Sequence, residues 1–376
     1  MNLRRVRAVA RKEFLHIIRD PRSLGMGIAI PMLMLLLFGY ALTLDVDNVP
    51  IMIWDQSHTT VSRDLISRFG RSRYFSIQGY ASSPREIERA IDRRDVLAAL
   101  VIPWDFARNV GRSGAKAQLI VDGSDANTAA IAIAYADAIA SQWSLDISVQ
   151  AVRRRGGVPA AMPVDVRPRV WFNPEMESRL YIVPGLIAVI MSVIAALMTS
   201  LTIAREWETG TMEQLISTPV RGHEIIIGKL IPYFVIGAID VVIAVIMGLV
   251  LFDVPFRGAP LLMVAFSSVF LIGTLSLGIL ISIVTRGQLL ASQVAMVTTF
   301  LPAFLLSGFM FDIANMPPPV QVITYLMPAR YFVALLKALF LKGVGVSVLA
   351  ADGVPLLIFA AAMLLLAIAR FKKKLV

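Results

Sequence analysis

Carboxylates and threonines are concentrated in one short polar stretch, residues 205–219 (REWETGTMEQLISTP), which lies between two long apolar runs. Its three glutamates suit ion pairing with a partner. Thr211 and Gln214 fit a capping box, and Pro219 would end the helix that follows. We therefore predict a helix of one or two turns that presents the acids to another protein; a solvated turn is the alternative. The residues concerned are Arg205, Glu206, Glu208, Gly210, Thr211, Glu213, Thr218 and Pro219.

The chain shows no pattern of a catalytic or metal centre. Residues 222–230 have the wrong spacing for a phosphate-binding loop and no Ser or Thr after the lysine. His16, His58 and His223 fall in separate segments, which favours structural or surface roles. Residues 122–125 (DGSD) lack the later ligands of a calcium loop and are better explained as a turn and helix cap. Cysteine is absent from the sequence. We expect no catalytic residue and no metal site in this chain.

One carboxylate lies inside a long apolar run. Asp240 is about midway along residues 224–252, where an ionised group in a membrane is costly and should face a cavity, a partner or another polar group. It could bind a cation or proton along a translocation path, or hydrogen-bond within the helix bundle; both interpretations stay open. Five small hydroxyl residues in the apolar runs could either line a translocation path or pack between helices. They are Ser192, Thr199, Ser200, Thr298 and Thr299.

The elements that position these residues are strongly apolar. Of the 376 residues, 57% are hydrophobic, which excludes an ordinary soluble domain. Runs of about 20 apolar residues are long enough to cross a bilayer. We predict an α-helical polytopic membrane protein with six transmembrane helices, and place the first span at residues 24–44 and the others at about 181–204, 224–252, 261–284, 289–311 and 355–370.

Basic residues predict the orientation. Residues 1–23 form a predicted amphipathic helix in the headgroup plane, because apolar side chains recur at near-helical spacing among arginines. This cluster and the basic residues 370–374 place both termini in the cytoplasm, together with residues 204–223. A net charge of +10 suggests nucleic acid for a soluble protein. Here basic residues orient the chain and contact membrane lipid, so we expect no nucleic-acid partner.

Residues 45–178 differ from the rest of the chain. Strand-like runs at 49–54, 74–78, 96–102 and 117–121 alternate with helical patterns at 60–69, 84–91, 103–110 and 127–152. Ser83 to Glu86 combine a capping box with proline at the first helical position. This alternation predicts an α/β extracytoplasmic domain inserted between the first and second spans. Residues 153–157 (RRRGG) are expected to form a flexible cationic tether.

Residues 312–352 are apolar but too interrupted for an ordinary span. Pro317 prevents a continuing helix, and Arg330, Lys337 and Lys342 break the apolar run that follows. We predict a re-entrant hairpin that dips into the outer leaflet. An interfacial amphipathic helix is the alternative.

The polar stretch 205–219 resembles the intracellular loop of type-two permeases of ATP-binding-cassette (ABC) exporters. Similar likenesses to that family occur at residues 11–23 (RKEFLHIIRDPRS), 301–311 (LPAFLLSGFMF) and 327–333 (MPARYFV). The resemblance covers nearly the whole chain and is strongest to the bacterial subgroup with a large extracytoplasmic domain, associated with drug and ion efflux. It implies that residues 204–223 carry a coupling helix, and that the re-entrant hairpin caps the path near Arg330 and Lys337.

The resemblance also implies the partners. A second permease protomer, identical or different, would pair through the first and fifth spans. Cytoplasmic ABC ATPase subunits would bind ATP and Mg, so no cofactor is expected in this chain. A periplasmic adaptor would bind the outer domain. We predict a permease of the bacterial inner membrane that exports a hydrophobic or amphipathic substrate. The alternatives are a membrane-anchored receptor or scaffold and an ion-coupled secondary transporter, although the latter would need more intramembrane charges and an internal repeat.

Overall fold

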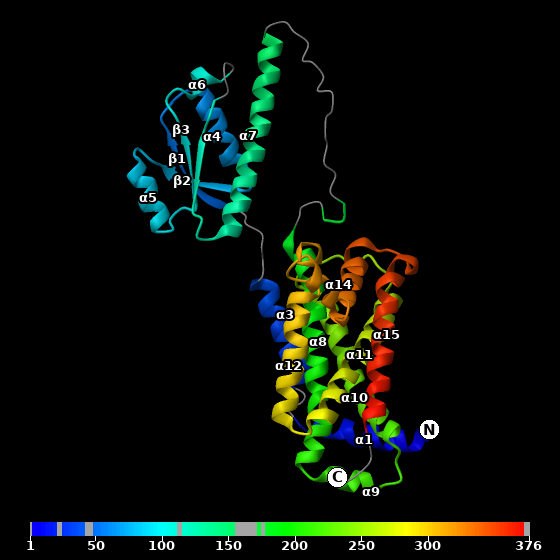
Figure 1. The fold of residues 1–376 in the computed structure, drawn as a ribbon. Helices are drawn as coiled ribbons and strands as arrows, with labels where there is room; N and C mark the ends of the chain where they lie inside the picture. Colours follow the sequence, from blue (N-terminus) through cyan, green and yellow to red (C-terminus); the bar gives the residue numbers. More distant parts are fainter. Residues whose placement is uncertain are drawn as a thin grey trace. The chain divides into compact units, whose positions relative to one another are not determined.

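The computed structural model describes residues 2–20, 25–41, 48–110, 115–154, 171–173 and 177–371. The chain divides into two compact units, which are described separately (Figure 1). Residues 1–43 and 169–376 form the helical unit, and residues 44–168 form the sheet-containing unit. The tether was predicted at residues 153–157, but Arg153 and Arg154 lie at the end of the helix Ala126–Arg154. Residues 155–157 and the terminal lysines at 372–374 lie outside the described residues.

Among the described residues of the helical unit, five helices are long and apolar enough to cross a membrane. A shorter apolar helix, Gly27–Ala41, contains part of the π-helical segment η1 (Gly25–Ala29) and α3 (Ile30–Ala41). Helix α1 (Leu3–Arg19) precedes it. The chain is thus a mostly helical, multi-pass membrane protein, and the count of six spans stays a prediction. The five long helices are α8 (Ser178–Glu208), α10 (Gly222–Val250), α11 (Pro260–Thr285), α12 (Gln288–Leu306) and α15 (Val346–Arg370).

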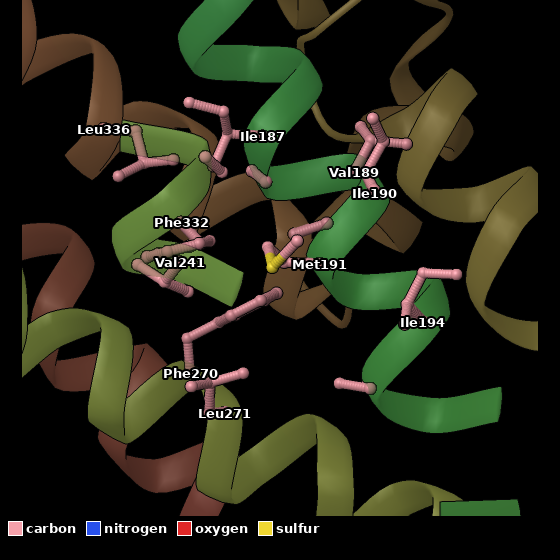
Figure 2. Close-up of a cluster of buried hydrophobic side chains, with 14 of the residues drawn as sticks. Ile187, Val189, Ile190, Met191, Ile194, Val241, Phe270, Leu271, Phe332 and Leu336 are labelled. Atoms are coloured by element: carbon pink, nitrogen blue, oxygen red, sulfur yellow. The ribbon is translucent and has the colours of Figure 1, made fainter. Parts of the chain in front are cut away.

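Helix α8 is the centre of this unit. Of its most apolar window, 89% is buried, compared with 22% for α12 and for α15. It contacts α3, α10, α11, α12 and α14. Figure 2 shows Ile187, Met191 and Ile194 of α8 in a core with side chains from the neighbouring helices. Gly278 brings α11 against α8, because a Cβ atom there would lie 2.3 Å from the carbonyl oxygen of Ala196.

The start of the last helix differs from the prediction, whereas the turn between α11 and α12 agrees with it. Helix α15 begins at Val346, nine residues before the predicted start at Pro355, which lies inside the helix. The predicted start of this helix was therefore wrong, because Pro355 is accommodated within α15. The turn between α11 and α12 is as tight as predicted: α11 ends at Thr285, Arg286 adopts a left-handed conformation with φ +55°, and α12 begins at Gln288.

The segment between α12 and α15 contains two short helices joined at a sharp bend. Helix α13 (Pro318–Thr324) and the run Pro328–Lys342, which comprises α14 (Pro328–Lys337) and the π-helical η3 (Ala338–Lys342), meet at 82°. A short 3₁₀ helix, η2 (Ile313–Asn315), precedes them. This is the geometry of a broken span or a re-entrant loop. The rings of Phe332 in α14 and Phe270 in α11 stack with centroids 4.0 Å apart.

The described part of the sheet-containing unit forms a four-stranded sheet in the order β2-β1-β3-β4; β1 is parallel to β2 and β3, and β4 is antiparallel to β3. The strands and helices lie close to the predicted ranges. They are β1 (Val49–Asp55), α4 (Thr60–Arg71), β2 (Phe75–Tyr80), α5 (Pro84–Asp92), β3 (Ala98–Ile102), α6 (Phe106–Asn109), β4 (Gln118–Val121) and α7 (Ala126–Arg154). Two apolar clusters hold the sheet to its helices, one with side chains of α4, α6 and α7 and one with α5.

The predicted capping box at the start of α5 is wrong in detail. Pro84 does occupy the first turn, but the Ser83 side chain makes no capping hydrogen bond. Glu86 instead accepts hydrogen bonds from the backbone N–H and the hydroxyl of Ser82, which lower its pKa. The cap is therefore formed one residue earlier than the sequence spacing indicated.

Candidate functional site: a buried ion cluster and an exposed short helix

At one end of the helical unit, α1 and the start of α10 lie beside the end of α8 and the short helix α9 (Thr211–Ser217) (Figure 1). The predicted loop 204–223 is divided among these elements. Helix α8 continues through Glu208, so Arg205 and Glu206 lie on its last turns. Gly210 precedes α9, and α10 already begins at Gly222.

Four charged side chains from three helices form a cluster at this end: Lys12 and Glu13 of α1, Glu206 of α8 and Lys229 of α10. We call them the ion cluster. The Lys229 ammonium lies 2.8 Å from Glu13 Oε1 and 3.0 Å from Glu206 Oε1. Lys12 Nζ lies 2.6 Å from the same Glu206 oxygen. The cluster therefore joins three helices through one carboxylate.

Glu206 was predicted to face a partner, and this is wrong. Glu206 is only 7% exposed, and its neighbours Glu13 and Lys229 are 4% and 1% exposed. The reason is that α8 stays helical past the membrane boundary expected from the sequence, which directs Glu206 towards α1 and α10. Buried charges need such pairing, because an isolated ion in an apolar interior is strongly destabilising.

Lys12 is the most accessible member of the ion cluster, with 54% of its side chain exposed. Burial works against its charge, but the hydrogen bond and the charge of Glu206, together with Glu13, outweigh this effect and raise its pKa. Lys12 therefore stays charged at neutral pH and shares Glu206 with Lys229.

A second set of contacts ties the start of α1 to the start of α10. Glu224 accepts hydrogen bonds from the backbone N–H of Asn2, at 2.7 Å, and of Arg221, at 3.0 Å. Arg5 donates to the carbonyl oxygen of Pro219 at 2.6 Å, just after α9. Gly228 allows the two helices to approach closely, because a Cβ atom there would lie 2.7 Å from Cβ of Val9. Helix α1 is thus attached to α10 along most of its length.

Helix α9 exposes a polar face that carries one acid, Glu213. Met212 is fully buried and anchors the helix, whereas Glu213 and Gln214 are exposed. The predicted capping box on Thr211 is wrong. Gly210 caps the helix with φ +72°, a left-handed conformation that suits glycine, and no side chain makes a capping hydrogen bond. Thr211 donates instead to the carbonyl oxygen of Glu206, at 3.4 Å. At the other end of α9, the Thr218 hydroxyl donates to the Leu215 carbonyl oxygen.

The remaining charged residues of the stretch contact other helices of the same chain. Glu208 is exposed and accepts hydrogen bonds from the backbone N–H and side-chain amide of Gln288 at the start of α12. Arg205 lies 3.5 Å from Asp20 and 3.1 Å from His16 Nε2, both at the end of α1. This end of α8 therefore contacts both α1 and α12.

The candidate path residues lie in several environments. Asp240 is 1% exposed, and its Oδ1 has no hydrogen-bond partner among the described residues. Thr199 lies between helices and donates to the carbonyl oxygen of Leu275 in α11, at 2.9 Å. Ser192 and Ser200 of α8 and Thr299 of α12 are buried, and Thr298 is exposed.

The two basic residues of the bent segment make mainly uncharged contacts. The Arg330 guanidinium lies 3.9 Å from the ring centroid of Tyr325 and donates a hydrogen bond to the Thr324 hydroxyl. Lys337 donates to the carbonyl oxygen of Gly308 at 2.9 Å and lies 4.1 Å from the ring centroid of Tyr181. Cation–π contacts and a backbone acceptor thus replace carboxylates here.

Sequence reasoning missed Lys12, Glu13 and Lys229. Two signals were available: Lys229 interrupts an apolar run, as Asp240 does, and Glu13 lies four residues from both Val9 and Ile17 on the apolar face of α1.

Among the residues described, no group of three or more His, Asp or Glu is placed to hold a metal ion. Asp122 and Asp125 form a turn and a helix cap as predicted, accepting from the backbone N–H of Ser124 and Thr128.

The sequence of this chain is similar to those of a known protein family. Residues 21–369 match the family described as ABC-2 family transporter protein. The chain is 38% identical over 345 residues to the probable multidrug ABC transporter permease YbhS of Escherichia coli, covering 91% of this chain and 90% of the relative. It is 30% identical over 374 residues to the probable multidrug ABC transporter permease YbhR of the same organism, covering 98% and 99%. The chain therefore belongs to the ABC-2 family of transporter permeases.

Proposed function

We propose that this chain is the membrane subunit of an exporter driven by ATP hydrolysis on separate cytoplasmic ATPase subunits, which would hold ATP and Mg. The observation that carries the proposal is α9. It is a short helix that exposes Glu213 and Gln214, is anchored by Met212 and is followed closely by the contact between Arg5 and Pro219. A docking helix needs this combination of an accessible surface and a firm attachment.

The ion cluster gives a physical route from α9 to the membrane helices. Lys12, Glu13, Glu206 and Lys229 join α1, α8 and α10 through contacts of 2.6–3.0 Å. Helix α9 is attached to this cluster through the hydrogen bond from Thr211 to the carbonyl oxygen of Glu206, so a displacement of α9 would move these helices together. ATP bound between two ATPase subunits would supply the free-energy difference between two states of the transporter.

In this topology the chain would lie in a bacterial inner membrane, with α9, both termini and the ion cluster on the cytoplasmic side. Two protomers, identical or different, would enclose the path, and the bent segment 318–342 would lie near its outer end. The sheet-containing unit would face outwards, where it could bind a periplasmic adaptor. Two relatives are named as probable multidrug permeases. A hydrophobic or amphipathic substrate is consistent with those names and with the apolar helices.

Co-purification under gentle detergent conditions tests this function. We expect an ATPase subunit to accompany the unaltered protein, and Glu213→Lys to reduce its recovery because the change reverses the charge of the exposed α9 face. Glu88→Lys in α5 is a matched control, since Glu88 is also an exposed helical glutamate. ATPase recovery that is equal for the two variants would refute docking on α9. Absence of any ATPase with the unaltered protein would favour the receptor or scaffold alternative.

A further inference from the structure

Strand β2 is an edge of the sheet, and part of its backbone is available for pairing. Among the described residues its only strand partner is β1. The Val49 N–H donates to the carbonyl oxygen of Tyr74 at 2.8 Å, so the backbone groups of Tyr74 point towards β1. Groups of successive residues point to opposite sides of a strand, so those of Phe75 and Ile77 point to the side where the described residues place no strand. β2 contains neither a charged residue nor a proline, two devices that keep such an edge from pairing.

A cavity of about 470 Å³ lies beside this edge, between α4 and β2. Helix α4 contributes Arg63, Ile66, Ser67 and Gly70 to its wall, and β2 contributes Ile77 and Tyr80. The helix and the strand are close at one end, because a Cβ atom at Gly70 would lie 3.1 Å from Ile77 Cδ1. Another side of α4 faces α7, since Trp143 donates to Asp64 at 2.9 Å. The cavity therefore lies on the side of α4 that is turned to the edge strand and not to α7.

An edge strand with an adjoining pocket is a recurrent arrangement for binding extended peptides. The added peptide pairs its backbone with the strand, and pockets take alternate side chains. Here Ile66 is buried and Ile77 is half-buried, which gives the cavity an apolar floor, while Tyr80 is 67% exposed. The register of β2 shifts beyond Ile77, so regular pairing covers only a few residues. The site therefore suits a short extended segment with an apolar side chain facing the cavity.

The exposed cations of α4 favour an acidic segment. Arg63 lines the cavity, and Arg71 follows directly after Gly70 in its wall. Both arginines are exposed, and neither forms an ion pair with a described residue. Arg73, shortly before β2, is also exposed. These charges would attract carboxylates and repel a basic peptide.

One carboxylate, Asp55, also lines the cavity, but the loop before α4 engages both of its oxygens. Its Oδ1 accepts from the backbone N–H of Ser57 and His58, at 3.0 and 3.2 Å. Its Oδ2 accepts from the Ser62 hydroxyl at 2.7 Å. These donors stabilise the charge of Asp55 within the loop. Arg63 thus stays available to a carboxylate of the ligand.

The spacing of the two arginines sets the spacing of the acids. Arg63 and Arg71 are eight residues apart on α4, which is about 12 Å along the helix axis. Residues i and i+4 of an extended peptide present side chains on one face about 13 Å apart. The side chain at i+2 lies between them on the same face, as Ile66, Ser67 and Gly70 lie between the arginines. Two acids four residues apart, with an apolar residue at the centre, therefore match this surface.

We propose that the edge of β2 and the cavity beside it bind an extended segment of a partner protein with the order acid-x-apolar-x-acid. The acids pair with Arg63 and Arg71, the apolar side chain enters the cavity, and the backbone pairs with Phe75 and Ile77. The β2 strand of a second copy is a poorer partner, because residues 71–80 contain no acid. Binding at this site needs neither ATP nor the ATPase, so it can be tested independently of the proposed transport function.

Fluorescence anisotropy of a labelled peptide tests the proposal on the full chain in phosphatidylcholine nanodiscs without nucleotide. The probe is fluorescein-Ser-Glu-Thr-Leu-Thr-Glu-Ser. We expect saturable binding, and about tenfold weaker binding when both glutamates are replaced by lysine or the leucine by serine. Absence of binding, or equal binding of the acidic and basic peptides, would overturn the proposal.

N-methylated peptides test backbone pairing with the unaltered protein. The N–H groups of neighbouring residues in an added strand point to opposite sides, so only one of the two can donate to β2. Methylation of the leucine nitrogen or of the following threonine nitrogen should therefore weaken binding in one case and leave it nearly unchanged in the other. Equal effects of the two methyl groups would refute strand addition.

Substitutions locate the site. Arg63→Glu should weaken binding about tenfold, whereas Arg85→Glu should not, because Arg85 is an exposed arginine of α5 outside the cavity wall. Ile77→Pro should bind about three- to tenfold more weakly than Ile77→Ala, since both lose the side chain but only proline lacks the N–H. Unchanged binding by Arg63→Glu would overturn the proposal. Dissociation of a dimer on peptide addition, measured by mass photometry, would also overturn it by assigning the edge to a second copy.

Discussion

Helices α14 and α9 lie at opposite ends of the helical unit (Figure 1). Lys337 belongs to α14, and Lys229 of α10 pairs with Glu206 on the last turns of α8, just before α9; different chemistry holds the two lysines. Lys229 is 1% exposed and contacts the carboxylates of Glu13 and Glu206, from two other helices. Lys337 contacts a backbone carbonyl oxygen and the face of Tyr181. One end is therefore joined by paired charges and the other by a neutral acceptor and an aromatic ring.

This difference has mechanical consequences. Removing one member of a buried ion pair leaves an uncompensated charge and costs several kcal/mol. Losing a cation–π contact or a hydrogen bond to a carbonyl costs much less. The charged contacts of Lys229 are thus more costly to break than the contacts of Lys337, although the apolar side chains of α14, such as Phe332 and Leu336, are themselves fully buried. The stronger attachment lies at the end where we propose that the ATPase docks.

The largest expected effect is that of Lys229→Met. The change leaves Glu13 and Glu206 buried with only the partly exposed Lys12 as a counter-ion, so we expect a loss of about 3–5 kcal/mol of folding free energy. Thermal unfolding in detergent measures it. Adding Glu13→Gln should restore part of the loss by removing one of the two carboxylates. An unfolding midpoint equal to that of Lys337→Met would contradict the comparison.

Gly228→Ala should have the next largest effect. The new Cβ atom would lie 2.7 Å from Cβ of Val9 and 3.1 Å from the Val6 carbonyl oxygen, so α1 must shift away from α10. Overpacking of this kind costs about 1–3 kcal/mol. Gly248→Ala in the same helix is the control, because its nearest contact is 3.5 Å and no shift is needed. Equal unfolding midpoints for the two variants would show that α1 is not held closely against α10.

Lys337→Met tests the contacts at the end of the helical unit that contains the bent segment. It removes the hydrogen bond to Gly308 and the contact with Tyr181 but leaves no acid unpaired among the contacts described, so the expected cost is about 1–2 kcal/mol. The measurement is again thermal unfolding, beside Lys229→Met. If Lys337→Met were the more damaging variant, the bent segment would be the more rigidly attached end.

The smallest effect concerns pH. The pKa of Lys12 is raised above its ordinary value of 10.5, so its stabilising contribution is complete below about pH 10.5 and is lost as the pH rises through the raised value. Lys12→Met should lack this alkaline loss. Unfolding midpoints of the two proteins should therefore converge above pH 10.5 after differing by a constant amount at lower pH. A difference that grows with alkaline pH would have the wrong sign for this pairing.

Periodicity and composition were sufficient for much of the architecture. The four strands, the helices of the sheet-containing unit and the long apolar helices were visible in the sequence because apolar residues recur with periods of 2 and 3.6 or fill whole runs. Helix ends were less predictable. Helix α15 includes Pro355, and α9 is capped by Gly210 rather than by Thr211, because local signals at a helix end compete with packing.

The sequence by itself determined a multi-pass membrane protein with a polar segment between two apolar helices, since hydropathy acts over short distances, and the resemblance of that segment to a known family indicated a permease. Only the tertiary structure decided what that segment contacts. Glu13, Glu206 and Lys229 are far apart in sequence, and the pairing of their charges depends on the close approach of α1 and α10, which Gly228 permits. An acid in a polar stretch has the same local signal whether it faces solvent or an ammonium group from another helix.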